Sequence, residues 1–152
     1  MPYNTLKENT FQFCKDFINN RLIRIHNQIL EIQTALTSET KSSAGDKHET
    51  GRAMVQLERE KLGAQLAEAE KIAQLLSKID IKTSQEKIGL GSLIKTNKFL
   101  YFIAISAGEY KSKDASVYCI SAATPIAKLL MGKCVGDSIT FNKVETTIKE
   151  IF

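Results

Sequence analysis

The stretch Lys41-Ser-Ser-Ala-Gly-Asp-Lys-His-Glu-Thr50 separates two long segments that carry a helical pattern of apolar residues. It holds no large apolar residue, so it contributes little to a core. Within it, Asp46 and Glu49 lie three residues apart. If a helix begins here, this spacing places both carboxylates on one of its faces. We interpret the stretch as the tip of a helical hairpin that presents two acids to a partner.

The same two acids also fit an ordinary helix start. In a capping box, Asp46 would accept hydrogen bonds from the backbone N–H groups that follow it, and Glu49 would reach back toward Asp46. The local sequence alone favours this interpretation. The two interpretations are compatible, because a capped helix start still faces solvent.

The segments on both sides of the tip predict an antiparallel helical hairpin. In residues 10–36, apolar side chains recur at spacings of three, four and seven, as in a coiled coil; they are Phe11, Cys14, Ile18, Leu22, Ile25, Ile29, Ile32 and Leu36. The same spacing returns after the tip with Val55, Leu62, Leu66, Ala69, Ala73 and Leu76. The two stripes can meet only if the chain folds back on itself, so we expect a hairpin over residues 1–80 with its tip at 41–51.

The shape of this hairpin leaves its use open. A long rod with a polar tip suits reaching into a narrow space. Two such helices can equally complete a bundle with a second copy of the chain.

Residues 80–87 form a polar connector, after which the pattern changes to that of strands. Alternating and β-branched residues predict strands at 88–95, 98–106, 117–121, 138–141 and 146–152. We expect a bulge at Gly89-Leu-Gly91 and a polar loop over 108–116. Thr124-Pro125 opens a short helix that ends at Gly132. The predicted fold class is therefore α+β, with a hairpin followed by a small antiparallel β domain, residues 88–152, that contains one short helix.

Composition is that of a folded protein, with 43% hydrophobic and 25% charged residues in a chain of 152. No apolar run approaches the ~20 residues that span a bilayer, and the polar first residues do not resemble a secretory signal. Cys14, Cys119 and Cys134 are odd in number and show no C-x-x-C spacing. This predicts reduced, partly buried thiols in a cytoplasmic protein, with neither a disulfide framework nor a zinc site.

Charge is divided unevenly along the chain. Residues 1–80 hold 11 basic and 11 acidic side chains, whereas residues 81–152 hold 10 basic and 6 acidic ones, a difference that equals the whole formal net charge of +4. This bias permits contact with nucleic acid or with an acidic protein surface. A solvated lysine face explains it equally well.

Two segments resemble the bacterial Gre-type transcript cleavage factors, GreA and GreB. The tip Gly45-Asp46-Lys47-His48-Glu49 is similar to their G-D-x-x-E tip. Residues 124–137 (Thr-Pro-Ile-Ala-Lys-Leu-Leu-Met-Gly-Lys-Cys-Val-Gly-Asp) are similar to their C-terminal segment, in which Ser-Pro opens a short helix before a Gly-Lys-x-x-Gly-Asp turn. The order of hairpin and β domain also agrees with that family.

The resemblance implies a mechanism. The coiled-coil hairpin would enter the secondary channel of RNA polymerase, while an FKBP-like β domain docks beside that channel. Asp46 and Glu49 would help the polymerase to hold a second Mg²⁺ and a water, so that the polymerase cleaves backtracked RNA near its 3′ end. Mg²⁺ is commonly held by one or two carboxylates together with waters and phosphate. The factor would then be a monomeric cofactor of the polymerase, and not an enzyme by itself.

Candidate partner-binding residues lie in or beside the two segments. These are Lys47, His48, Arg52, Thr124, Pro125 and Lys133. Lys133, which flanks a predicted turn with Asp137, fits a structural role as well, and His48 fits either an RNA phosphate contact or simple exposure. Met54 and Met131 are expected to be packing residues.

The tip departs from the family pattern after Glu49. Where the family continues with Asn-x-Glu-Tyr, this chain has Thr50-Gly-Arg-Ala53, so Arg52 reverses a charge beside the predicted metal site. This favours a regulator that binds polymerase and occupies the channel without promoting cleavage. A separate alternative is a coiled-coil interaction protein unrelated to transcription. The β domain has no Trp and few aromatic residues to line a proline pocket, so prolyl isomerase activity is not expected.

Overall fold

The computed structural model describes the backbone of residues 2–41 and 45–152 and the side chains of residues 2–37 and 50–152. The chain divides into two compact units. We call Ile18–Ala73 the hairpin unit, and Met1–Phe17 together with Gln74–Phe152 the sheet unit. In the described part of the chain, no helix is long and apolar enough to cross a membrane.

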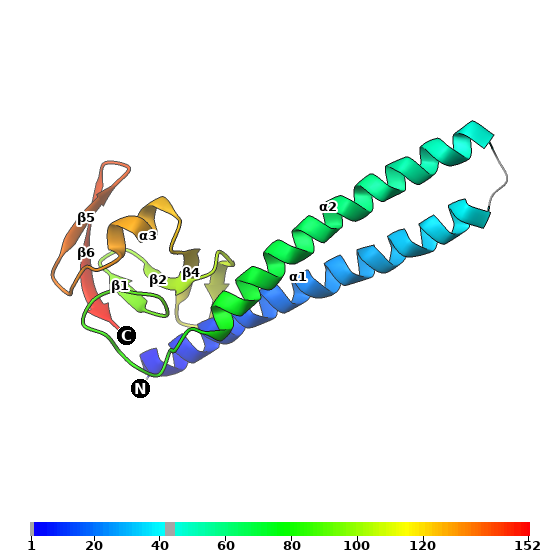
Figure 1. Cartoon of the computed structure of the whole chain (residues 1–152). Coiled ribbons are helices and arrows are strands. Elements are labelled where there is room, and N and C mark those ends of the chain that lie inside the picture. Colours follow the sequence, from blue (N-terminus) through cyan, green and yellow to red (C-terminus); the bar gives the residue numbers. More distant parts are fainter. Residues whose placement is uncertain (1, 42–44) are drawn as a thin grey trace. The chain divides into compact units, whose positions relative to one another are not determined.

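The hairpin unit consists of two antiparallel helices (Figure 1). They belong to α1 (Pro2–Lys41) and α2 (Gly45–Ser77). The buried side chains are those that the seven-residue spacing selects, namely Ile18, Ile25, Ile29, Leu62 and Ala69. The predicted hairpin is therefore confirmed, with helices that extend beyond the predicted 10–36 and 55–76.

The sheet unit contains one six-stranded sheet. Its strands are β1 (Leu93–Thr96), β2 (Leu100–Ala104), β3 (Gly108–Lys111), β4 (Ser116–Ser121), β5 (Ser138–Phe141) and β6 (Val144–Ile151), in the order β3-β4-β2-β1-β6-β5. All neighbours are antiparallel except β2 and β4, which are parallel. The helix α3 (Pro125–Leu130) lies in the crossing from β4 to β5. The predicted class, a hairpin followed by a mostly antiparallel sheet with one short helix, is confirmed.

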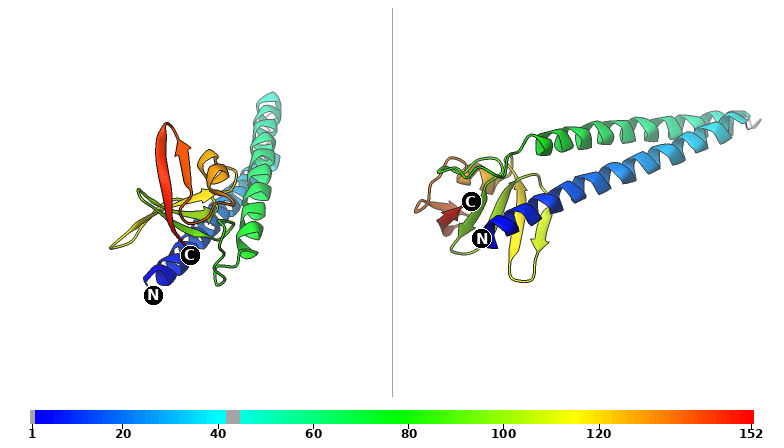
Figure 2. Two further views of the ribbon diagram at one scale, coloured as in Figure 1. Left: turned by 90° about the vertical axis from the view of Figure 1, so that its left-hand side faces the viewer. Right: turned by 90° about the horizontal axis from the view of Figure 1, so that it is seen from below.

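The first turns of α1 cover one face of this sheet (Figure 2). The ring of Phe11 meets the edge of Phe102 on β2, with centroids 6.3 Å apart. The ring of Phe13 lies 5.2 Å from that of Tyr110 on β3, and Tyr3 stacks on Phe152 at 4.5 Å. Aromatic side chains along the start of α1 therefore hold it against β2 inside the sheet, against the edge strand β3 and against the residue that follows β6.

The opposite face of the sheet holds a separate core. Ile94, Ile103 and Ile148 on β1, β2 and β6 pack with Ala127 and Leu130 of α3, and all five are fully buried. Ile88 and Ile139 complete this cluster. The short helix α3 is thus held by two side chains that reach into a β-sheet core.

Three local predictions were wrong. Residues 108–111, expected in a polar loop, form the edge strand β3, because Tyr110 and Glu109 pair with Val117 and Tyr118 of β4. The segment Gly89–Gly91 is a turn and not a strand with a bulge, since Gly91 has a φ of +85° and its N–H bonds to the carbonyl of Ile103 at 2.7 Å. The last strand begins at Val144 and not at residue 146.

The units also divide the chain elsewhere than at the predicted connector. Residues 80–87 lie inside the sheet unit, which begins again at Gln74 and includes the first seventeen residues of the chain. The physical reason is the aromatic contact between the start of α1 and the strands, which periodicity along a single helix does not predict.

Candidate partner-binding site

The predicted tip lies at the start of α2. This helix begins at Gly45, so Asp46 and Glu49 belong to the same helix and are three residues apart. The side chains of Asp46, Lys47, His48 and Glu49 lie outside the described residues. Their roles as magnesium ligands and partner contacts therefore stay predictions. Among the side chains that the structure describes, no group of three or more His, Cys, Asp or Glu could hold a metal ion.

Beyond the acids, α2 presents an exposed surface on its next turns. Arg52 and Ala53, the residues that depart from the Gre pattern, are both exposed. Two large apolar side chains follow, Met54 at 67% and Leu57 at 65% exposure. The expectation that Met54 packs in a core is wrong, because the buried stripe of α2 runs along another side of the helix.

The second predicted site is built around the N-terminus of α3. Thr124 is its N-cap, with extended backbone (φ −68°, ψ 150°), and its hydroxyl accepts from the N–H of Ala127 at 3.4 Å. The same hydroxyl donates to the carbonyl of Ser121 at 2.8 Å. Pro125 occupies the first turn, where no backbone N–H is needed. Thr124 is thus half-buried and structural, whereas Pro125 is exposed and free for a contact.

The turn after α3 is fixed by backbone hydrogen bonds. Gly132, with a φ of +78°, donates to the carbonyl of Ile88 at 2.8 Å, and Ile88 donates to the carbonyl of Lys133 at 2.9 Å. The Asp137 carboxylate accepts from the N–H of Cys134 at 2.8 Å. This assigns Asp137 a structural role and leaves the side chain of Lys133 exposed.

Exposed apolar side chains surround this turn, and the sequence alone did not reveal them. Leu129 is 38% exposed, Met131 36% and Val135 57%. We call these three residues with Pro125 and Lys133 the α3 patch. The prediction that Met131 packs in the core is wrong. The sequence did hold a signal for the exposed side of α3: Ala127 and Leu130 are three residues apart and form the buried side of this helix, so Leu129 points outward.

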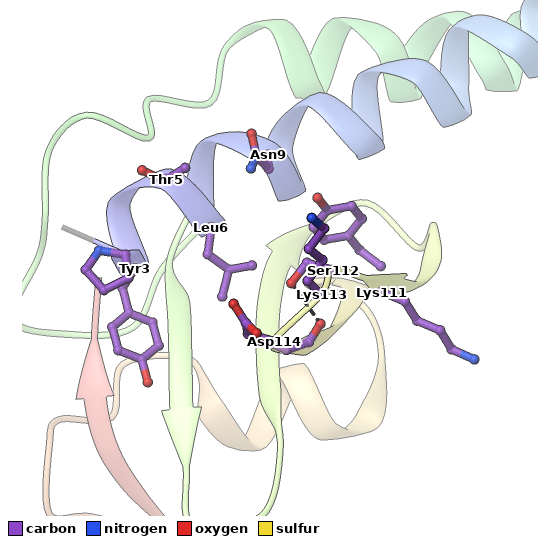
Figure 3. Close-up of a pocket in the computed structure, with 11 residues that line it drawn as sticks. Tyr3, Thr5, Leu6, Asn9, Lys111, Ser112, Lys113 and Asp114 are labelled. Atoms are coloured by element: carbon purple, nitrogen blue, oxygen red, sulfur yellow. Dashed lines mark hydrogen bonds between the residues drawn. The ribbon is translucent and has the colours of Figure 1, made fainter.

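A cavity of about 790 Å³ lies between the first turns of α1 and the β3–β4 hairpin (Figure 3). Leu6 and Asp114 project toward the same space, whereas Lys111 extends away from it and lies 3.5 Å from Glu109. The hairpin is closed by Ser112, whose N–H donates to the carbonyl of Ala115 at 2.8 Å. None of the predicted site residues lines this cavity.

Neither a family profile nor a curated protein matches the sequence. One solved structure, titled "Structure of the transcription factor Gfh1", is similar at 23% sequence identity, over 90% of this chain and 92% of that one, with a TM-score of 0.36. At so low a TM-score, the similarity supports no conclusion about function on its own.

Proposed function

We propose that this protein is a Gre-type elongation factor that binds RNA polymerase and promotes cleavage of backtracked RNA through Asp46 and Glu49. One observation carries the proposal: the G-D-x-x-E motif opens α2, the second helix of the hairpin. The second motif supports it, because Thr124-Pro125 caps a helix and an exposed turn follows, as in the segment it resembles.

The proposed role of the acids follows from magnesium chemistry. Mg²⁺ is held by carboxylates only together with waters and substrate phosphates, and two acids on an isolated helix make a poor site. In the proposed complex, the polymerase supplies the remaining ligands. Asp46 and Glu49 would help to hold the ion and its water, and a two-metal site would stabilise the attacking and leaving oxygens together.

Replacing Asp46→Asn and Glu49→Gln together tests this role, because the change keeps side-chain size and removes both charges. Polymerase binding should persist while stimulated cleavage falls at least tenfold, which needs only about 1.4 kcal/mol of lost transition-state stabilisation. Added Mg²⁺ should restore part of the activity, because mass action compensates for weaker ligation. A matched control is Glu58→Gln with Glu60→Gln, two exposed acids farther along α2.

Arg52 supports a second candidate function. Its exposed guanidinium lies three residues from Glu49 on α2, where a positive charge weakens the field that attracts Mg²⁺. In this alternative the protein occupies the secondary channel and does not promote cleavage. If the wild type binds polymerase without cleavage, Arg52→Glu with Ala53→Tyr should confer it; continued inactivity would assign the tip an occluding role.

The third candidate, a coiled-coil protein unrelated to transcription, is separated by a simpler measurement. Full-length protein is incubated with purified core RNA polymerase and passed through gel filtration. Co-elution supports the two candidate functions that require polymerase binding. Elution apart from the polymerase at micromolar concentrations of each would refute both.

A further inference from the structure

The fold brings two of the three cysteines together from distant parts of the chain. Phe102 on β2 and Cys119 on β4 are register partners, so they lie side by side on one face of the sheet. Phe11 and Cys14 are three residues apart on α1, about one helical turn, and so share a side of the helix. Phe11 meets Phe102 at 6.3 Å, which brings this side of α1 onto the sheet face that carries Cys119, and Cys14 interacts with Cys119 there.

The two thiols lie close enough to interact. The neighbouring Cys14 side chain, together with burial, raises the pKa of Cys119 well above its usual range. Both residues are buried, at 0% and 3% exposure, whereas Cys134 is partly exposed. All three thiols are free in this structure.

We propose that Cys14 and Cys119 are an oxidation site of this protein and that a peroxide converts them into an intramolecular disulfide between α1 and β4. Both residues belong to the sheet unit, so no change in the hairpin unit is required. The two neighbouring sulfurs have to close to an S–S bond of about 2.05 Å. This inference is independent of the proposed function.

The chemistry balances with one molecule of peroxide. Either thiol can react first. When Cys14 does, its sulfur bonds to one peroxide oxygen, the O–O bond breaks, and the departing hydroxide takes the Cys14 proton as water. The Cys119 sulfur then attacks the sulfenic acid; the S–O bond breaks, and the hydroxyl leaves with the Cys119 proton as a second water. Two thiols are oxidised by two electrons in total, and the peroxide is reduced.

The geometry also sets the rate and the consequence. Burial limits the access of peroxide to both sulfurs, so this pair should react more slowly than a free thiol at the surface. Once formed, the disulfide closes a loop of about a hundred residues, and cross-links over long loops restrict the unfolded chain strongly. Oxidation should therefore stabilise the sheet unit by joining α1 to its sheet.

Peroxide treatment of the full-length protein, followed by tryptic mass spectrometry without reduction, tests the site. We expect a cross-link between the peptides of residues 8–15 and 114–128. In the Cys134→Ser variant, which keeps only this pair of thiols, thiol titration of the denatured protein should fall from two groups to none. The Cys134→Ser variant should give the same cross-link and melt at a higher temperature after oxidation, and dithiothreitol should reverse the shift. As a matched control, Cys119→Ser with Cys134→Ser should show no reversible shift.

Two results would overturn the proposal. The first is that the Cys14 and Cys119 thiols of the wild-type protein stay intact under a peroxide treatment that fully oxidises Cys134. The other is a Cys14–Cys119 cross-link that lowers the melting temperature, since the disulfide would then strain the sheet unit. Because the cross-link is read in the wild-type chain, neither result depends on whether a variant folds.

Discussion

At the residue scale, the least expected feature is a lysine inside the sheet unit. Lys7 on α1 is 4% exposed. Burial lowers its pKa from the ordinary value of 10.5, and the nearby Asp80 carboxylate opposes this shift only in part. Asp80 itself is committed to a turn, where it accepts from the N–H of Lys82 at 2.8 Å and the hydroxyl of Thr83 at 2.9 Å. The buried ammonium therefore reduces stability at neutral pH.

Lys7→Met should raise the free energy of unfolding at pH 7 by on the order of 1 kcal/mol, because it keeps the apolar stem and removes a desolvated charge. In the wild type the unfolded chain binds more protons than the folded one between the lowered pKa and 10.5. The wild type should thus gain stability as pH rises through that window, and Lys7→Met should lose this gain. Urea titrations at pH 7 and 10 measure both effects, and Lys78→Met, at an exposed lysine, is the control. If the Lys7→Met variant is less stable than the wild type at pH 7, the attraction between Lys7 and Asp80 outweighs the cost of burying the charge.

Two glycines with the same backbone angle offer a matched pair. Gly91 and Gly108 have φ of +85° and +84°. A Cβ added at Gly91 would lie 2.7 Å from Ile79 Cγ2 and 3.0 Å from the carbonyl oxygen of Asp80. A Cβ added at Gly108 would meet nothing within 4 Å. Both alanine variants should lose about 1–2 kcal/mol to the left-handed conformation. Gly91→Ala should lose roughly 1–3 kcal/mol more by overpacking. Equal losses in denaturant titrations would mean that residues 79–80 move aside freely.

At the scale of elements, α3 shows what local sequence can and cannot predict. Its cap, its first-turn proline and its terminal glycine were all predicted, because each acts through neighbouring backbone groups. The edge strand β3 was missed, since Gly108-Glu-Tyr-Lys111 is polar and becomes a strand only by pairing with β4. The parallel β2–β4 pair and the Cys14–Cys119 contact were missed for the same reason, because they depend on residues far apart in sequence.

The cap of α3 should be measurable by a short series. Thr124→Ala should cost about 1 kcal/mol of stability, because it removes the side-chain oxygen that accepts from Ala127. Thr124→Ser keeps that oxygen and should cost much less. The comparison uses denaturant titration; an equal loss in both variants would assign the effect to the missing methyl group and not to the cap.

The exposed turn after α3 gives the docking prediction, which rests on the proposed function. Lys133→Glu should weaken polymerase binding at least tenfold, or about 1.4 kcal/mol, if the α3 patch is the docking surface. Lys149→Glu, a charge reversal at another exposed lysine, on β6, should leave binding within a factor of two or three. Fluorescence anisotropy with labelled protein and core polymerase measures both. Equal affinities for the two variants would place docking outside the α3 patch.

At the scale of the whole molecule, the first seventeen residues decide which pieces can fold. They cover the face of the sheet that carries Phe102 and Cys119, and they belong to the same compact unit as the last strand. A fragment of residues 82–152 leaves that face exposed to water. The predicted boundary at 80–87 therefore marks a peptide connection between elements and not the edge of a folding unit.

The 82–152 fragment alone should aggregate or lack a cooperative thermal transition, whereas mixing it with a fragment of residues 1–81 should restore one. By the same reasoning, trypsin should cut first at the exposed Lys82 and Lys87, and the nicked protein should still elute as one species in gel filtration. Circular dichroism melts and native chromatography follow these outcomes. A cooperative transition for 82–152 alone would show that the start of α1 is dispensable for the sheet.

The pairing of β1 with β6 and the stacking of Tyr3 on Phe152 also dictate an order of events during synthesis on the ribosome. The helices of the hairpin unit make contacts that are local in sequence, so they can form while later residues are still being added. The sheet is incomplete until residues 144–152 have emerged from the ribosome. Until then the aromatic side chains at the start of α1 have no complete sheet to pack against. We expect the nascent chain to expose Phe11 and Phe13 for most of its synthesis, and therefore to need a chaperone at a length where its hairpin is already complete.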